Sequence, residues 1–279
     1  MQVTFYGVRG SCPAPGPDFI KYGGNTACVH VCLDDGTDII LDAGTGIKNL
    51  GQKLIKQNND IHLLLTHNHW DHIQGFPFFA PIYQPQRKIF ITPGQITIDA
   101  DHAILEQMSG SYFPVDYKTL PSNIQIIPQP KEVSQWKIGE AKISRLATNH
   151  PGSGSSFCIE ADGKKVAYIT DNELYPPHKK NTDFVDWVEF SCDADLIIHD
   201  AQYMNADMPA KSGWGHSVAE EAVQLAIDSR TKRMALYSHD HARSDNEIAE
   251  IESQCQEIIE IGGADLEIFA AAEGLTITL

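Results

Sequence analysis

Four metal-binding side chains lie within six consecutive residues of the chain, His67-Asn68-His69-Trp70-Asp71-His72. This H-x-H-x-D-H pattern follows the apolar run 61–66, which has the length of a β-strand. Neutral imidazoles and a carboxylate suit a borderline divalent cation such as zinc. A strand that ends in such a loop would present these ligands to a cleft. We therefore predict that the three histidines and the aspartate bind metal.

Three further candidate ligands stand where other predicted strands end. They are His150, Asp171 and His239, with His241 as an alternative to His239. One such residue alone is usually an ordinary loop residue, but the recurrence of the arrangement after the first motif favours ligation. The alignment of the last strand end favours His239 over His241.

The size and charge of the chain limit its class. With 279 residues it is near the upper limit for one hydrophobic core, so we predict a single domain over residues 1–279. The net charge of −16 argues against a general nucleic-acid binder, and no long nucleic-acid partner is expected. A small phosphorylated substrate remains compatible, because bound metals supply local positive charge.

The chain shows no sign of export or of membrane insertion. No apolar stretch approaches the roughly 20 residues that span a bilayer, so no membrane partner is expected. Residues 1–10 lack the charged start and long apolar centre of a signal peptide. The six cysteines contain no C-x-x-C pair and are too sparse for a disulfide scaffold. These features predict a cytoplasmic protein with reduced thiols.

The apolar pattern predicts many strands with helices between them. Strands are predicted at 2–8, 27–33, 37–41, 61–66, 88–92, 124–127, 141–146, 156–161, 165–170, 196–199, 234–237, 266–270 and 275–279. Helices are predicted at 47–57, 97–108, 217–229 and 246–261. Ser217 is the expected N-cap of the third helix, and Gly262-Gly263 closes the fourth. This alternation favours a layered α/β domain.

The motif and the order of the later ligands resemble the metallo-β-lactamase superfamily over nearly the whole chain. The resemblance implies an αββα sandwich with metals at one edge and two divalent ions, zinc first, with manganese or iron also accepted by such ligands. The implied first metal is held by His67, His69 and His150, the second by Asp71, His72 and His239, and Asp171 bridges both. Asp42 matches an early aspartate that supports the metal loop. A homodimer is the family expectation.

A second pair of segments resembles tRNase Z and its phosphodiesterase relatives. The segments 199–203 and 211–217 are similar to the His-Glu-Ala-Thr-Phe and Gly-His-Ser-Thr elements of that group. The resemblance makes His216 the general acid that protonates the leaving oxygen and Asp200 its orienting partner. Together with Asp71 they form the predicted catalytic set. Asp200 stands for the family's glutamate and is one methylene shorter, which leaves the contact geometry open.

The expected substrate is a small phosphodiester. The segments 7–13 and 22–26 resemble a bacterial group of cyclic-nucleotide phosphodiesterase-like metallohydrolases, and no basic, Gly-rich insertion of the tRNase Z kind is present. We therefore favour a compound such as a 3′,5′-cyclic nucleotide, attacked by a metal-bridging hydroxide. Arg9 and Asn25 are candidate substrate contacts.

Three aromatic residues are candidates for the rim of the substrate site. Trp70, Phe76 and Phe113 could pack on a base, although core positions are equally compatible with their types.

Two other functions stay open at this point. The same metal site could serve the hydrolysis of a carboxylic ester, lactone or thioester. Hydrolysis of an alkyl phosphodiester needs the proton from His216 more strongly than hydrolysis of an activated lactone does. A non-catalytic metal-bearing binding or sensor protein is the alternative from another class. The complete ligand set weighs against the latter, because a decayed enzyme would be expected to lose ligands.

Overall fold

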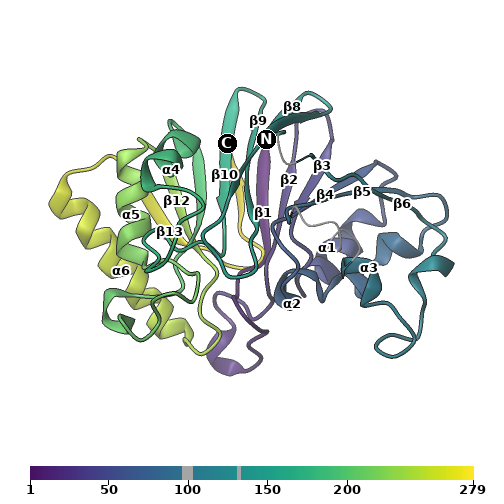
Figure 1. The fold of residues 1–279 in the computed structure, drawn as a ribbon, viewed down its shortest axis with the longest axis horizontal. Helices are drawn as coiled ribbons and strands as arrows, with labels where there is room; N and C mark the ends of the chain where they lie inside the picture. Colours follow the sequence, from purple (N-terminus) through teal and green to yellow (C-terminus); the bar gives the residue numbers. More distant parts are fainter. Residues whose placement is uncertain (96–102, 131–132) are drawn as a thin grey trace.

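The computed structural model of the protein describes residues 1–95, 103–130 and 133–279. Two seven-stranded β-sheets pack face to face in the middle of the molecule, and helices cover the outer face of each sheet (Figure 1). The predicted αββα sandwich in one domain is confirmed. Within the described ranges, no helix is long and apolar enough to cross a bilayer.

The first sheet has the strand order β14-β1-β2-β3-β4-β5-β6. Its strands are β1 (Gln2–Gly7), β2 (Cys28–Cys32), β3 (Asp38–Leu41), β4 (Ile61–Leu65), β5 (Lys88–Pro93), β6 (Asn123–Ile126) and β14 (Thr276–Thr278). The pairs are antiparallel from β14 to β3 and parallel from β3 to β6. The α-helices on this side are α1 (Ile47–Leu54), α2 (Trp70–Ile73) and α3 (Ala103–Glu106).

The second sheet has the order β13-β12-β11-β10-β9-β8-β7. Its strands are β7 (Gln135–Ile138), β8 (Ala141–Ala147), β9 (Ser155–Ala161), β10 (Lys164–Ile169), β11 (Leu196–Asp200), β12 (Arg233–Tyr237) and β13 (Glu267–Ala270). The pairs are antiparallel from β7 to β10 and parallel from β10 to β13. The α-helices on this side are α4 (Phe184–Ser191), α5 (Ala219–Asp228) and α6 (Asp245–Gly262).

The main hydrophobic core lies between the two sheets. Val3 and Phe5 of β1 alternate with outward residues and are fully buried there, as are Phe157 and Tyr168 of the second sheet. Strands with period-two burial contribute one face to this core, and the other face packs under the helices. Two further apolar clusters fill those helix–sheet spaces. Both faces of each sheet are therefore packed against apolar residues.

Most predicted elements are present with ends shifted by one or a few residues, but four differences matter. The strand β7 and the helix α4 were not predicted. Val218 is the N-cap of α5, and Ser217 Oγ instead donates a hydrogen bond of 2.6 Å to the carbonyl of Asn172. The predicted helix 97–108 is described only from residue 103, where α3 forms, and its first part lies outside the described residues.

The parallel strands of both sheets deliver polar residues to one edge of the sandwich. Asp42 follows β3, the H-x-H-x-D-H loop follows β4, Asp171 follows β10 and Asp200 ends β11. The carboxyl ends of parallel strands are the usual place for a ligand site in α/β sheets. The architecture therefore gathers most of the sequence-predicted ligands, although they are far apart in the chain.

Candidate metal centre

Three histidines and one carboxylate form the first ligand group. His67, His69, His150 and Asp171 each offer one ligand atom, and these atoms all lie within 4.8 Å of one another. His150 Nε2 is 3.0 Å from His69 Nδ1, and Asp171 Oδ2 is 3.5 Å from His67 Nε2. Nitrogen and oxygen donors in this number suit a four-coordinate divalent cation such as zinc.

The second ligand group shares Asp171 with the first. It contains Asp71, His72 and Asp171, and His72 Nε2 is 3.2 Å from Asp171 Oδ1 and 3.4 Å from Asp71 Oδ2. Asp171 therefore directs one oxygen to each group. Its backbone has a φ of 49°, a left-handed conformation that aspartate tolerates better than most residues. The Ser11 N–H donates to Asp71 Oδ2 over 2.8 Å and fixes this carboxylate.

The residues fit a bound cation by their own chemistry. His67 Nε2 and His72 Nε2 are buried and have no hydrogen-bond partner among the described residues, although buried ring nitrogens are normally paired. Burial and the neighbouring His72 lower the pKa of His67 well below its usual value, so that its ring is neutral near pH 7 and can donate a lone pair. Burial opposes the charge of His72 too, but nearby carboxylates, Asp171 first, raise its pKa.

Asp42 supports the metal loop from behind. It accepts hydrogen bonds from the Thr66 N–H at 2.8 Å, from His72 Nδ1 at 2.9 Å and from Tyr168 Oη at 2.9 Å. Its φ of 62° turns it into this position directly after β3. The carboxylate fixes the His72 tautomer that leaves Nε2 toward the ligand group. Thr66 and Tyr168 were not singled out from the sequence, because no local pattern marks residues that act through another side chain.

Replacing Asp42 with asparagine tests this support. An amide nitrogen would face donors where an oxygen now accepts, so we expect a loss of about 2–4 kcal/mol in the free energy of unfolding of the metal-free protein. Metal affinity should also fall by about 10–100-fold. Urea unfolding and competition with a chromogenic chelator measure the two effects. Unchanged metal affinity in the folded variant would show that Asp42 does not orient the ligands.

The structure does not bring His239 to either ligand group. Its Nε2 donates a hydrogen bond of 2.9 Å to the carbonyl of Ala271, and its ring packs edge-on against Tyr22. Burial lowers its pKa to about 4, as expected for a neutral structural histidine. This hydrogen bond occupies Nε2 only, and His239 belongs to neither ligand group, so its role as a ligand stays a prediction. The alternative, His241, has a 45% exposed side chain near Asp240 and also lies in neither group.

His216 and Asp200 meet beside the ligand groups. His216 Nδ1 lies 2.7 Å from Asp200 Oδ2, so the shorter aspartate still reaches the imidazole. Together with Asp171 they form a third compact group of ligand-type atoms. Burial lowers the pKa of His216, but Asp200 and then Asp171 outweigh it and raise the value to about 9. The ring is thus protonated at neutral pH and can donate a proton.

Glu173 holds the loop that carries His216, a role that no motif in the sequence predicts. Its two carboxylate oxygens accept hydrogen bonds from the N–H groups of Gly213 at 2.9 Å and Gly215 at 3.0 Å. The carbonyl of Gly215 accepts from His150 Nδ1 at 2.8 Å. A Cβ on residue 215 would lie 2.3 Å from that nitrogen, so only glycine fits. One buried carboxylate therefore positions both the acid loop and a ligand histidine.

Glu221, in the first turn of α5, provides a pH-dependent prediction. Burial, Glu173 and Glu220 raise its pKa from 4.5 to about 7. A raised carboxyl pKa means that its contribution to stability is fully present below about pH 4.5 and is lost as pH rises through about 7. Glu221→Gln should therefore raise the free energy of unfolding at pH 9 by on the order of 1–2 kcal/mol after allowance for partial exposure. Thermal unfolding at pH 9 and pH 5 measures this, and an equal gain at both values would contradict it.

Arg9 and Asn25 are engaged within the protein and do not point to a substrate. The Arg9 side chain is fully buried and donates to the carbonyls of Gly23 at 2.7 Å and Arg243 at 2.7 Å. Asn25 donates through its backbone N–H and its Nδ2 to the carboxylate of Glu273. Both residues tie chain segments together, so their assignment as substrate contacts is corrected.

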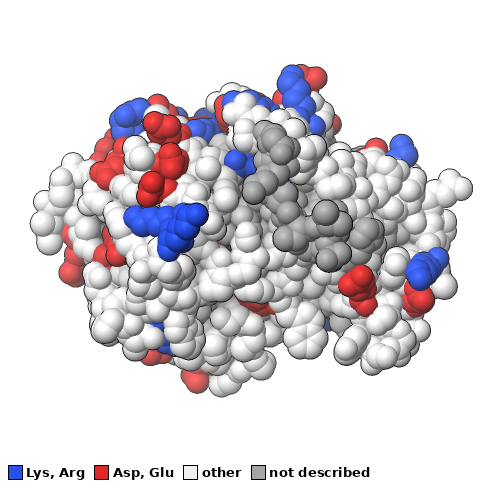
Figure 2. All heavy atoms as spheres, viewed as in Figure 1, with Lys and Arg blue, Asp and Glu red and all other residues white. Residues whose placement is uncertain are grey.

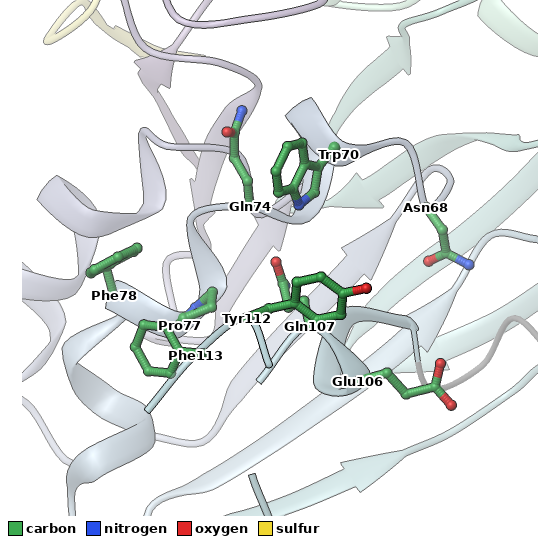
Figure 3. Close-up of a pocket in the computed structure, with 9 residues that line it drawn as sticks. All are labelled: Asn68, Trp70, Gln74, Pro77, Phe78, Glu106, Gln107, Tyr112 and Phe113. Atoms are coloured by element: carbon green, nitrogen blue, oxygen red, sulfur yellow. The ribbon is translucent and has the colours of Figure 1, made fainter. Parts of the chain in front are cut away.

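The three aromatic candidates divide between core and surface. Phe76 is fully buried in the cluster under the first sheet. Trp70 and Phe113 line a cavity beside the metal loop, together with Tyr112 (Figure 3). Phe76 is therefore a core residue, whereas Trp70 and Phe113 keep their predicted place beside the loop, and Tyr112 joins them there.

Residues 37–239 match the family model described as Beta-lactamase superfamily domain. The chain belongs to the beta-lactamase superfamily. It is also 34% identical to a Ribonuclease Z of Haloferax volcanii, over 98% of this chain and 93% of that protein. This superfamily member is a metal-dependent hydrolase, and its predicted place in the tRNase Z-like phosphodiesterase branch is confirmed.

Solved structures agree on the fold. The metallo-beta-lactamase fold protein YhfI from Bacillus subtilis superposes with a TM-score of 0.71 at 19% identity, covering 99% of this chain and 98% of that one. The short form of human tRNase Z superposes with a TM-score of 0.64 at 18% identity, covering 100% and 99%. The superfamily fold is thus shared across nearly the full length.

The expectation that excluded a long nucleic acid was wrong. The Haloferax volcanii relative is a ribonuclease, and it matches this superfamily member nearly end to end. Net charge was a poor guide because it sums over the whole surface. Figure 2 shows acidic and basic side chains mostly over the upper and left parts of one face, with few below its middle. Cations bound at the ligand groups would add local positive charge.

Proposed function

We propose that this chain is a phosphodiesterase that cleaves RNA, with two divalent ions held by the two ligand groups. The pair of His216 and Asp200 beside the shared Asp171 carries the proposal, because an imidazolium at this place suits a leaving group that needs a proton. The relationship to Ribonuclease Z supports RNA over the cyclic nucleotide that the sequence had favoured. Six unpaired cysteines support a cytoplasmic location.

The roles of the chain's own residues follow from their contacts. His67, His69 and His150 with Asp171 would hold the first ion, and Asp71 and His72 with the other oxygen of Asp171 the second. Divalent ions there, zinc first by donor type, would polarise a phosphate oxygen and lower the pKa of a bound water. His216 would donate a proton to the departing oxygen, and Asp200 would orient and stabilise the imidazolium.

Substrate assays with the reconstituted protein test the proposal. We expect turnover of bis(p-nitrophenyl) phosphate and cleavage of a tRNA transcript after loading with zinc, manganese or iron, and loss of both after chelation. The Asp171→Ala variant is the control for contaminating nucleases. Turnover of 3′,5′-cyclic AMP without RNA cleavage would contradict the RNA assignment. Turnover of p-nitrophenyl acetate alone would favour the ester-hydrolase alternative.

A further inference from the structure

A cavity of about 610 Å³ opens directly beside the H-x-H-x-D-H loop (Figure 3). This volume lies in the range of small-molecule binding sites. It is lined by Asn68, Trp70, Gln74, Pro77, Phe78, Glu106, Gln107, Tyr112 and Phe113. Asn68 and Trp70 alternate with the ligands in the motif, so an occupant of the cavity lies next to the metal loop.

The walls of this cavity are aromatic and open to solvent. Trp70 is 71% exposed and Tyr112 is 82% exposed, while Phe78 and Phe113 contact each other edge-on with ring centroids 5.5 Å apart. Large aromatic surfaces that gather unprotected around one hollow mark an interaction site more often than a packing accident. Their flat faces suit a planar, aromatic group.

The charges of the lining residues indicate which part of a substrate the cavity can bind. None of the nine lining residues is a lysine or arginine, and Glu106 is the one that carries a charge. A phosphate would be repelled by that carboxylate and would find no cation. A heterocycle with amino groups would instead find a hydrogen-bond acceptor in Glu106, as carboxylates accept from the amino group of cytosine.

We propose that this cavity is a nucleobase subsite, in which a base next to the scissile phosphate stacks on Trp70 and Tyr112. The inference rests on the proposed phosphodiesterase function and names the substrate part that the site selects. The position of Trp70 between His69 and Asp71 supports it, because a nucleotide whose phosphate lies at the ligand groups can place its base in the adjoining hollow. Glu106 favours adenine, guanine or cytosine over uracil.

Binding experiments test the subsite without turnover. The metal-loaded protein should bind AMP about 10-fold more tightly than ribose 5-phosphate, and Trp70→Ala and Tyr112→Ala should each remove most of that difference. Trp70→Phe should retain part of it. Tyr175→Ala is the matched control, because Tyr175 is 48% exposed but does not line the cavity. Equal binding of AMP and ribose 5-phosphate, or unchanged AMP binding by Trp70→Ala, would overturn the proposal.

Kinetics on short RNAs separate this inference from the proposed function. For an RNA with adenine at the cleavage site, Trp70→Ala should raise KM about 10-fold. The same variant should not change KM for an RNA that is abasic there. The subsite is wrong if wild-type protein cleaves both RNAs with the same KM. If AMP binds through Trp70 but no phosphodiester is cleaved with any metal, the subsite holds and the phosphodiesterase proposal fails.

Discussion

Replacing His216 with alanine is expected to lower kcat for RNA by about 10²–10⁴-fold, the usual contribution of a general acid. An alkoxide is a poor leaving group and needs a proton as it departs. His216 can supply this proton, because Asp200 holds its protonated imidazole beside the shared Asp171. The same variant should lose far less activity on bis(p-nitrophenyl) phosphate, since nitrophenolate departs without a proton. The ratio of the two losses is therefore the measurement, and metal content confirms that the ligand groups are intact.

The pH dependence gives a second view of the same residue. A general acid must be protonated, so RNA cleavage should decline at alkaline pH, where the His216 imidazolium that Asp200 stabilises loses its proton. Asp200→Asn removes this carboxylate and should move the decline to lower pH.

The His216→Ala variant can also contradict the role of this residue. Equal losses of activity on RNA and on bis(p-nitrophenyl) phosphate would show that His216 does not protonate the leaving group and acts on both reactions in the same way.

The sequence predicted much of the fold because buried strands and helices have characteristic local patterns of apolar residues. The runs 61–66 and 196–199 are mostly apolar, as buried parallel strands are, and both form strands. The helix α4 was missed because its phenylalanine, valine and tryptophan residues have no strong helical preference, and its start depends on Asp183 and Asp186 in a capping box. The strand β7 lies at the edge of the second sheet and has a mixed polar and apolar sequence. Packing constrains the residue types of an edge strand less than those of a central strand, so the pattern that predicts a strand is weak there.

The candidate site likewise contains residues that local sequence patterns predict and residues whose placement depends on contacts between distant parts of the chain. The spacing in the metal loop is local, so its four ligand types could be read directly. His239 could not be placed, because a one-residue offset after a strand decides the face to which a side chain points. Its backbone pairs with the segment at Arg9, its N–H donating to the Val8 carbonyl and its own carbonyl accepting from Gly10. These long-range pairs turn the ring toward Ala271.

The burial of Arg9 depends on the same chain closure. Its guanidinium donates to carbonyls of Gly23, Asp240 and Arg243, residues that only the folded topology brings together. A charged side chain near a motif suggests substrate binding as long as its partners are unknown. Gly23 is more than ten residues from Arg9 along the chain, and Asp240 and Arg243 are more than two hundred residues away. No local pattern encodes such contacts.

The matched pair His150→Ala and His239→Ala is expected to separate a ligand histidine from a structural one. His150 offers Nε2 to the first group, so its loss should lower the metal content below the roughly two ions per chain that such centres hold, and should reduce kcat by at least about 100-fold. His239 lies in neither group, so its variant should keep the full metal content. Elemental analysis of the folded, reconstituted proteins measures both.

Stability alone does not separate the two histidines. His239→Ala removes a buried ring and leaves the Ala271 carbonyl without its donor, so the free energy of unfolding should fall by about 2–4 kcal/mol. The metal-free His150→Ala protein also loses a buried ring and leaves the Gly215 carbonyl without its donor, so its free energy of unfolding should fall by a similar amount, and metal content separates the two variants. Loss of metal from folded His239→Ala would return that residue to the ligand set. Retention by both variants would show that the first ion does not need His150, and the three-histidine assignment would fall.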